Sequence, residues 1–487
     1  MASTSLAPPM DPNLDATAQA DLVRAGEVSS RELVEASIER IEAMNGDLNA
    51  VIHPLFEEAV ATEPPDGPFK GVPFVVKDLI CSVAGAPQHE GMRFLRDLGF
   101  RADEDSWLAA RFRKAGFVFV GKTNTPELGI LPTTEPLAYG PARNPWDRSR
   151  STGGSSGGSG AAVASGMVAI GHANDGGGSI RIPASCNGLV GLKATRGRVS
   201  MAPLGDFASG LGTELVVSRS VRDTAAVLEW TCAETPPGEP YFAPARERPY
   251  TEEVGADPGR LRIGVMTAAP GGQAETHPDC VTAAEEAGRA LESLGHSVEL
   301  SHPPALDDPG YIENFLVRWT AAIAAALDYW SLRTGRPIEP DDVEPTTWAL
   351  AEQGRAHSGA RYLMAVGYAQ LVTRTVAQWW QDFDLLVTPT MALPPAELGT
   401  IGSGADDPDP AMPIVRSVPY AVFTAGFNAT GQPAISLPLH WTEGGLPIGV
   451  QLVADLGRED LLIRVASQLE QAVPWADRRP PVFAVAA

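Results

Sequence analysis

The sequence predicts an α/β protein in which a central mixed β-sheet is surrounded by α-helices. Strand-like and helix-like segments alternate along the whole chain, which is typical of this fold class. The chain has 487 residues, 44% of them hydrophobic, so it is long enough to bury a large core. It shows no internal repeat. We therefore expect a single large domain over residues 1–487.

In the N-terminal half, hydrophobic periodicity and turn residues indicate the elements. Ser30 is the expected cap of the second of two N-terminal helices. The expected elements are two helices within 15–44, an extended segment at 49–55, a strand at 71–77, a helix at 105–115, a strand at 117–120, helix-compatible sequence at 161–170 and strand-like sequence at 188–192.

The C-terminal half continues the alternation. Proline-rich segments at 233–260 and 391–413 read as long surface loops within the same domain. The expected elements are a strand–helix unit at 220–230, a strand at 261–266, a helix at 280–294, a strand at 297–300, helices within 309–332 and 345–382, a strand at 384–387, an irregular or helical segment at 418–430, strands at 434–437 and 448–452, and a helix at 458–471.

Charge and cysteine content limit the function classes. The net charge is −23, which disfavours nucleic acid and anionic membrane surfaces as main partners, and we expect neither. The four cysteines form no CxxC pair, which disfavours a structural zinc site and suits a reducing compartment. The sequence has no signal-peptide pattern and no apolar stretch of about twenty residues. We expect a cytoplasmic protein without a metal or another cofactor.

The most unusual stretch runs from residue 151 to residue 198. Residues 153–160 contain five glycines and three serines, and three further glycines directly precede Ser179. Glycine is best justified where the backbone needs unusual dihedral angles or must approach a ligand closely. A flexible linker is disfavoured, because apolar helix-like and strand-like sequence is interleaved with the glycines. The stretch therefore predicts a functional loop region.

Two familiar glycine-rich motifs fit this stretch poorly. A phosphate-binding loop requires a lysine where Ser159 stands. The GxSxG elbow of α/β-hydrolases matches around Ser155 and Ser156, but residues 144–150 before it are not strand-like. That elbow also needs a late histidine base, and His440 reads as a structural or surface residue.

A serine nucleophile without histidine still needs a base, and a neutral lysine can serve. Lys77 ends an apolar strand, so it is either an exposed strand-end residue or a buried base with a lowered pKa. A second serine could carry the proton between the lysine and the nucleophile. Backbone N–H groups at 176–179 could bind a tetrahedral oxyanion.

Eight short motifs stand out along the chain: GVPFVVKD at 71–78, GKTNTPE at 121–127, NPW at 144–146, GGSSGG at 153–158, DGGGSIRIPA at 175–184, GLKATRGR at 191–198, NATGQPAISLP at 428–438 and PIGVQ at 447–451. In these motifs the chain resembles the amidase signature family over about residues 15–475. The resemblance implies N-terminal helices at 15–60, a signature core at 61–230 and a variable part at 231–475 that completes the sheet and the substrate pocket.

The resemblance implies a role for each matching residue. Ser179 would be the acyl-forming nucleophile, and Ser155, preceded by a cis peptide bond in the family, would be the bridging serine. Lys77 would act as the base and then as the acid for the leaving amine. The oxyanion hole would lie at the backbone of Gly176, Gly177, Gly178 and Ser179, held by Asp175 and Arg181.

The sequence departs from the common family pattern at two positions. Gly176 stands where a threonine, isoleucine or similar residue is usual, and Ala194 replaces a proline. The first change would loosen the oxyanion loop and could widen the range of acyl groups. By resemblance, the substrate pocket would include Gly129, Ile130, Leu131, Trp319 and Trp330.

Four further segments resemble a bacterial branch of the family that contains cyclic-dimer (nylon oligomer) hydrolases. They lie at 18–24, 170–175, 336–343 and 457–462. The branch implies hydrolysis of small, fairly apolar linear, aryl or cyclic amides. Carbamate (urethane) or ester hydrolysis by the same residues is one alternative, a glutaminase-type subunit of an amidotransferase is another, and a non-catalytic binding protein is a third. The expected partner is a small-molecule substrate, and the chain is either a monomer or a homodimer.

Overall fold

The computed structural model describes residues 11–484 and confirms a single large α/β domain. Its eleven strands form one mixed sheet in the order β1-β3-β2-β4-β6-β5-β10-β11-β9-β7-β8. The strands are β1 Val51–Pro54, β2 Pro73–Lys77, β3 Val118–Thr123, β4 Ile170–Asp175, β5 Val190–Lys193, β6 Thr213–Ser218, β7 Arg262–Val265, β8 Ser297–Leu300, β9 Leu385–Pro389, β10 Ala434–Trp441 and β11 Pro447–Ala454.

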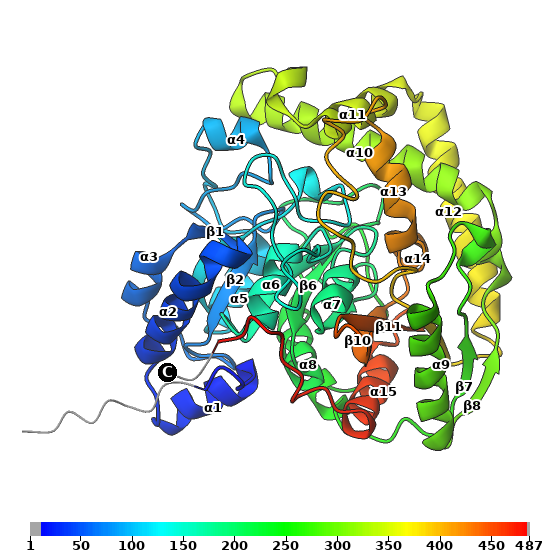
Figure 1. The fold of residues 1–487 in the computed structure, drawn as a ribbon, viewed down its shortest axis with the longest axis horizontal. Helices are drawn as coiled ribbons and strands as arrows, with labels where there is room; N and C mark the ends of the chain where they lie inside the picture. The colour runs from blue at the N-terminus through cyan, green and yellow to red at the C-terminus, as the bar shows by residue number, and fades with distance from the viewer. Residues whose placement is uncertain (1–10, 485–487) are drawn as a thin grey trace, which may run out of the picture.

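Helices pack around this sheet, whereas the edge strand β8 lies at the rim of the molecule and is mostly exposed (Figure 1). Within the described residues the α-helices are α1 Ala16–Ala25, α2 Ser30–Leu48, α3 Phe56–Ala61, α4 Arg93–Asp97, α5 Trp107–Lys114, α6 Gly157–Ala164, α7 Arg181–Asn187, α8 Val221–Thr231, α9 Pro278–Ser293, α10 Gly310–Thr334, α11 Pro345–Ala356, α12 Gly359–Trp379, α13 Met412–Ala421, α14 Ala425–Thr430 and α15 Glu459–Ala472. Short 3₁₀ helices are η1 Glu127–Gly129, η2 Tyr250–Glu253, η3 Pro270–Gly272, η4 Pro304–Asp307 and η5 Pro340–Asp342.

The sheet brings the two halves of the sequence side by side. Strands β2, β3 and β4 pair in parallel, whereas β5 and β6 pair antiparallel with each other. The β5 strand then pairs antiparallel with β10 from the end of the chain. This pairing places residues near 190 beside residues near 435, so the C-terminal region completes the sheet next to the glycine-rich stretch.

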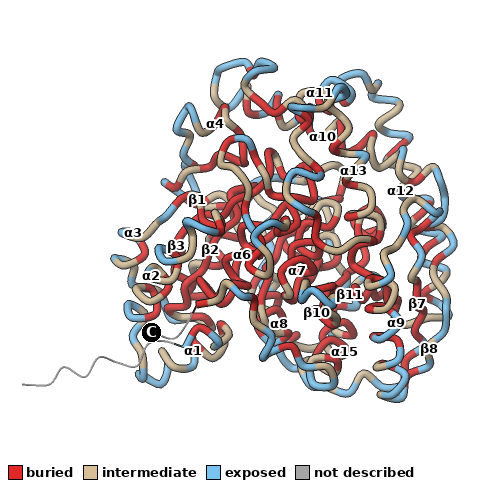
Figure 2. Tube along the Cα trace, in the orientation of Figure 1, coloured by how far each residue is buried: buried red, intermediate tan, exposed pale blue. Residues whose placement is uncertain are grey.

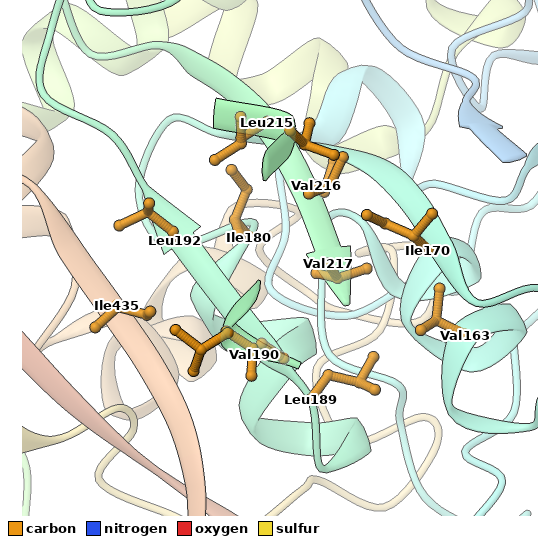
Figure 3. Close-up of a cluster of buried hydrophobic side chains, with 14 of the residues drawn as sticks. Val163, Ile170, Ile180, Leu189, Val190, Leu192, Leu215, Val216, Val217 and Ile435 are labelled. Atoms are coloured by element: carbon orange, nitrogen blue, oxygen red, sulfur yellow. The ribbon is translucent and has the colours of Figure 1, made fainter. Parts of the chain in front are cut away.

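The core lies on both faces of the central strands. Buried residues fill the middle of the molecule and exposed residues its rim (Figure 2). Around the glycine-rich stretch, aliphatic side chains from α6, β4, β5, β6 and β10 meet in one cluster (Figure 3). Its labelled members include Val163, Ile170, Val190, Val217 and Ile435. This cluster supports the loops that leave β4 and enter α6 and α7.

The N-terminal cap of α2 differs from the expectation. Ser29, not Ser30, is the N-cap, and its side chain accepts a hydrogen bond from the backbone N–H of Glu32. The Glu32 carboxylate in turn accepts from the backbone N–H of Ser29 at 2.8 Å. This reciprocal capping box requires a glutamate three residues after the cap, which fixes the helix start at Ser30.

The long helical region at 345–382 is two helices, because α11 ends at Ala356 and Ser358 caps the start of α12. Helices α10, α11 and α12 lie together at the upper right of Figure 1. Among the described residues, no helix is long and apolar enough to cross a membrane.

Candidate active site

Ser155, within the glycine-rich stretch, lies in a tight loop just before α6. Gly154 and Ser155 are joined by a cis peptide bond. A β-carbon on Gly154 would lie 2.5 Å from the carbonyl oxygen of Leu131, and one on Gly158 would lie 2.5 Å from the backbone nitrogen of Asn124. Both distances are far below a van der Waals contact, so these glycines allow the loop to pack directly against neighbouring backbone.

Lys77 reaches this serine from the end of β2. Its Nζ lies 2.6 Å from Oγ of Ser155 and 2.6 Å from Oδ1 of Asn174, the penultimate residue of β4. Asn174 is itself oriented, because its side-chain N–H donates to the carbonyl of Leu79 at 3.1 Å. The parallel pairing of β2 with β4 places the lysine and the asparagine at the same sheet edge.

Burial determines the charge state of Lys77. The side chain is fully buried, and this desolvation lowers its pKa well below the usual lysine value. The carboxylates of Asp175, Glu214 and Glu90 act in the opposite direction but do not outweigh it. A neutral amine can donate to Asn174 while its lone pair accepts the hydroxyl proton of Ser155. The geometry therefore suits proton transfer between these two groups.

Ser179 lies in the turn between β4 and α7, beside a buried ion pair. Nε of Arg181 donates to Oδ2 of Asp175 and its second terminal nitrogen donates to Oδ1, both at 2.9 Å. Although burial alone would raise it, Arg181 lowers the pKa of Asp175 to about 2, so the carboxylate stays ionised. Asp175 also accepts from the backbone N–H groups of Gly178 and Ile180 at 2.7 and 3.2 Å. This carboxylate thus fixes the turn that carries Ser179.

The bond from Gly178 changes one expectation about the oxyanion hole. The sequence motif predicts that its N–H faces a substrate, but it donates to Asp175 inside the turn. The carbonyl of neighbouring Gly177 accepts from the hydroxyl of Thr424 at 2.7 Å. The backbone N–H groups of Gly176, Gly177 and Ser179 are therefore the candidate donors for an oxyanion.

Several residues that hold this turn were missed by the sequence reasoning. Arg181 donates to Gln451 at 2.7 Å, to Asn428 at 2.6 Å and to the carbonyl of Thr424 at 3.0 Å. Asn428 and Gln451 lie within the motifs at 428–438 and 447–451. Their polar side chains in apolar surroundings were the available signal, but only the fold shows which charge they bind.

Ser179 opens onto a cavity of about 130 Å³. Its walls come mainly from α10 and α13 on one side and from the segment after η1 on the other. The lining residues are Ile130, Leu131, Pro132, Gly177, Ser179, Ile182, Gln273, Tyr311, Ile312, Phe315, Leu316, Trp319, Ile414, Ser417, Val418, Ala421, Val422 and Ala425. Within the part of the chain that the structure describes, this lining contains no charged side chain.

The expected pocket residues divide into three groups. Ile130, Leu131 and Trp319 line the cavity. Gly129 packs against Ser155: a β-carbon on this glycine would lie only 3.1 Å from Oγ of Ser155. Trp330 lies elsewhere and does not line the cavity: it is buried, and its Nε1 donates to the Glu90 carboxylate at 2.9 Å. Helical spacing alone could not show toward which neighbour this indole points.

His440, the base required by the rejected elbow motif, also lies elsewhere. Its Nδ1 is 2.9 Å from the carboxylate of Glu286 on α9. It belongs to a partly exposed surface pair at the end of β10.

Comparison with known proteins identifies the family of this chain. The amidase family model matches residues 32–463. The 6-aminohexanoate-cyclic-dimer hydrolases of Pseudomonas sp. (strain NK87) and Paenarthrobacter ureafaciens are each 44% identical over 478 residues, covering 96% of this chain and 97% of theirs.

Solved structures show the same similarity. A 6-aminohexanoate cyclic dimer hydrolase complexed with substrate has a TM-score of 0.94 and 43% identity, and covers 98% of this chain and 100% of its own. A bacterial aryl acylamidase has a TM-score of 0.84 and 25% identity, with 95% and 97% coverage. The chain therefore belongs to the amidase signature family and is a hydrolase of amide C–N bonds.

Proposed function

We propose that this enzyme hydrolyses small, fairly apolar amides through an acyl-enzyme formed on Ser179. The observation that carries the proposal is the buried Lys77, whose Nζ lies 2.6 Å from Oγ of Ser155. Burial lowers the pKa of Lys77 well below its usual value, which favours the neutral amine that a base requires. Ser179, in the turn between β4 and α7, lies in the wall of the cavity, where the carbonyl group of a bound substrate can meet its hydroxyl.

The proposed acylation begins with proton transfer along the two serines. Ser179 attacks the amide carbonyl carbon and passes its proton to Ser155, whose own proton moves to Nζ of Lys77. The carbonyl oxygen becomes an oxyanion and accepts hydrogen bonds from the backbone N–H groups of Gly176, Gly177 and Ser179. When the C–N bond breaks, the proton returns from Lys77 through Ser155 to the leaving nitrogen.

Deacylation repeats these transfers with water. Lys77, through Ser155, takes a proton from a water molecule that attacks the acyl carbon. The tetrahedral intermediate then collapses, the C–O bond to Ser179 breaks, and the proton returns to its oxygen. The carboxylic acid leaves, and all three side chains regain their starting protonation states.

The cavity supports an uncharged substrate. An ionised group entering a site without charged side chains in its described lining would lose its hydration without gaining a partner. We therefore propose neutral cyclic, aryl or alkyl amides as substrates. The names of the similar proteins support this choice, since they include a cyclic-dimer hydrolase and an aryl acylamidase. Carbamates and esters present a similar carbonyl to the same residues and are the alternative substrates.

Glutamine hydrolysis inside a larger complex fits the cavity less well. One similar structure is a chain of the glutamyl-tRNA(Gln) amidotransferase from Thermotoga maritima, with a TM-score of 0.77 and 25% identity. Free glutamine carries an ammonium and a carboxylate, and the described cavity lining offers neither an acidic nor a basic side chain to bind them.

We propose a cytoplasmic location for this enzyme. Its four free cysteine thiols support a reducing compartment.

The test is hydrolysis of a panel of cyclic amides, anilides, carbamates, esters and glutamine by the purified enzyme. Ser179→Ala is expected to abolish turnover. The matched control is Ser165→Ala at the end of α6, a buried serine whose hydroxyl donates to the carbonyl of Ala162 in the same helix; it is expected to retain activity. Full amide hydrolysis by Ser179→Ala would falsify the proposed role of Ser179, and preferred hydrolysis of glutamine would overturn the substrate class.

A further inference from the structure

Gly176, the first residue of the proposed oxyanion loop, is covered by two aromatic rings. A β-carbon on this glycine would lie 3.1 Å from Cε1 of Phe207 and 3.2 Å from Cζ3 of Trp319. Such distances are shorter than ordinary carbon–carbon contacts. The φ angle of Gly176 lies outside the left-handed region, so it is the rings, and not the backbone conformation, that crowd a side chain at this position.

The two rings support each other. Phe207 meets Trp319 edge to face, with ring centroids 5.7 Å apart and an interplanar angle of 86°. On its other side Trp319 stacks on Phe315, one helical turn earlier in α10, at 5.6 Å and 19°. These are favourable aromatic geometries. Trp319 and Phe315 also line the cavity, so one aromatic surface touches both the loop and the space for the acyl group.

The segment that carries Phe207 is held by two arginines, buried Arg318 and half-buried Arg196. Arg318, on α10 next to Trp319, donates to the carbonyls of Ala208 and Ser209 at 2.9 and 2.8 Å. Arg196 donates to the carbonyl of Gly210 at 2.6 Å. Ala208 and Ser209 have φ angles of 50° and 57°, which are uncommon for residues with side chains. The arginine bonds hold this turn, and with it Phe207, against α10.

We propose that Phe207 and Trp319 form an aromatic clamp that positions the backbone of Gly176 and thereby couples the oxyanion loop to the acyl side of the cavity. This inference rests on the function proposed above. The Asp175–Arg181 pair holds one side of the loop, and the aromatic clamp holds the other. Glycine at 176 is the residue that lets the indole approach the loop closely. Gly176 and Trp319 therefore act as a matched pair of positioning residues.

A double-mutant cycle tests this coupling. In the wild type, Gly176→Ala is expected to lower kcat for all amides by about tenfold with little change in KM. The reason is that the displaced loop no longer directs its backbone N–H groups toward the oxyanion. Trp319→Leu is expected to favour bulkier acyl groups in kcat/KM. In the Trp319→Leu background, Gly176→Ala should lower kcat by less than about twofold, because the indole is gone and the Phe207 ring that rests on it can move aside.

A matched control is the same cycle with Val418→Ala. Val418 lines the same cavity from α13, whereas the atoms nearest to a β-carbon on Gly176 belong to Phe207 and Trp319. Gly176→Ala should keep its full effect in that background. Thermal unfolding of every variant separates loss of fold from loss of loop position.

An alkylboronic acid gives a readout besides turnover. It forms a tetrahedral anionic adduct with a serine, so its affinity should fall with kcat in Gly176→Ala and recover in Gly176→Ala/Trp319→Leu. Equal effects of Gly176→Ala with and without Trp319, in kcat and in boronate affinity, would overturn the clamp. Ser179→Ala is measured in parallel: if it stays active, the proposed function itself fails, whereas an inactive Ser179→Ala with an additive cycle refutes only the clamp.

Discussion

The two sides of the cavity are built on different principles. The side that carries Lys77, Ser155 and Ser179 is held by short buried hydrogen bonds and the Asp175–Arg181 ion pair. The side formed by α10 and α13 presents mainly apolar side chains. Hydrogen-bond networks fix atoms within narrow limits, whereas apolar packing tolerates changes of similar volume. We infer that the first side sets the chemistry and the second sets which acyl groups fit.

The largest expected effect comes from replacing Lys77, the proposed base. Lys77→Met keeps the apolar stem but removes the amine, and is expected to lower kcat by about 10³-fold or more. The same change should stabilise the fold, since the unfolded lysine binds a proton that the buried lysine does not. Wild-type stability therefore rises with pH, and the advantage of the variant should shrink as pH approaches the usual lysine pKa. Urea unfolding at several pH values, together with kcat, measures both effects; a destabilised Lys77→Met at neutral pH would contradict the assignment of a neutral lysine.

The second expected effect tests the ion pair. Arg181→Met leaves the buried Asp175 carboxylate without its cation and is expected to cost about 3–5 kcal/mol of unfolding free energy. Activity should fall as well, because the turn that carries Ser179 loses its anchor. Denaturant unfolding gives the energy, and Arg416→Met is the control, since Arg416 pairs with Asp407 near the surface. A similar loss of unfolding free energy in Arg181→Met and Arg416→Met would contradict the special role of the buried ion pair on the hydrogen-bonded side of the cavity.

Lys77 and Arg181 also show how much of the site can be predicted from the sequence. The α/β alternation and the positions of Lys77 and Arg181 follow from local patterns and motifs. The strand ends are less exact: the strand expected at 434–437 continues to Trp441, and the one expected at 117–120 continues to Thr123. Asn174, Thr424, Asn428 and Gln451 do not, because their roles depend on which strand edges meet after folding. Their partners are between 97 and 270 positions away in the chain, beyond any local periodicity.

Trp330 gives a third, smaller prediction. Trp330→Phe removes the indole N–H that donates to Glu90, a carboxyl whose pKa is raised by burial although this bond opposes the shift. The expected loss is about 1–2 kcal/mol of unfolding free energy with unchanged preference among amide substrates. The measurement compares thermal unfolding with kcat/KM for a small and a bulky amide. A changed preference between the small and the bulky amide would indicate that Trp330 contributes to the substrate pocket after all.

The smallest expected effect is at His440. His440→Ala breaks a partly exposed pair with Glu286 and should change the unfolding free energy by less than about 1 kcal/mol. Its kcat should equal that of the wild type. A large loss of kcat with normal stability would revive the histidine-based mechanism that the structure disfavours.

The most direct test of the account is the pH dependence of kcat/KM in Asn174→Asp. The proposed mechanism requires neutral Lys77, so kcat/KM of the wild type should rise with pH to a plateau, with an inflection well below the usual lysine pKa. A carboxylate in place of the amide that lies 2.6 Å from Nζ would favour the ammonium form. The account predicts that the inflection moves to higher pH by about one unit or more in this variant. An inflection at the same pH in both enzymes would contradict a mechanism in which Lys77 is the base.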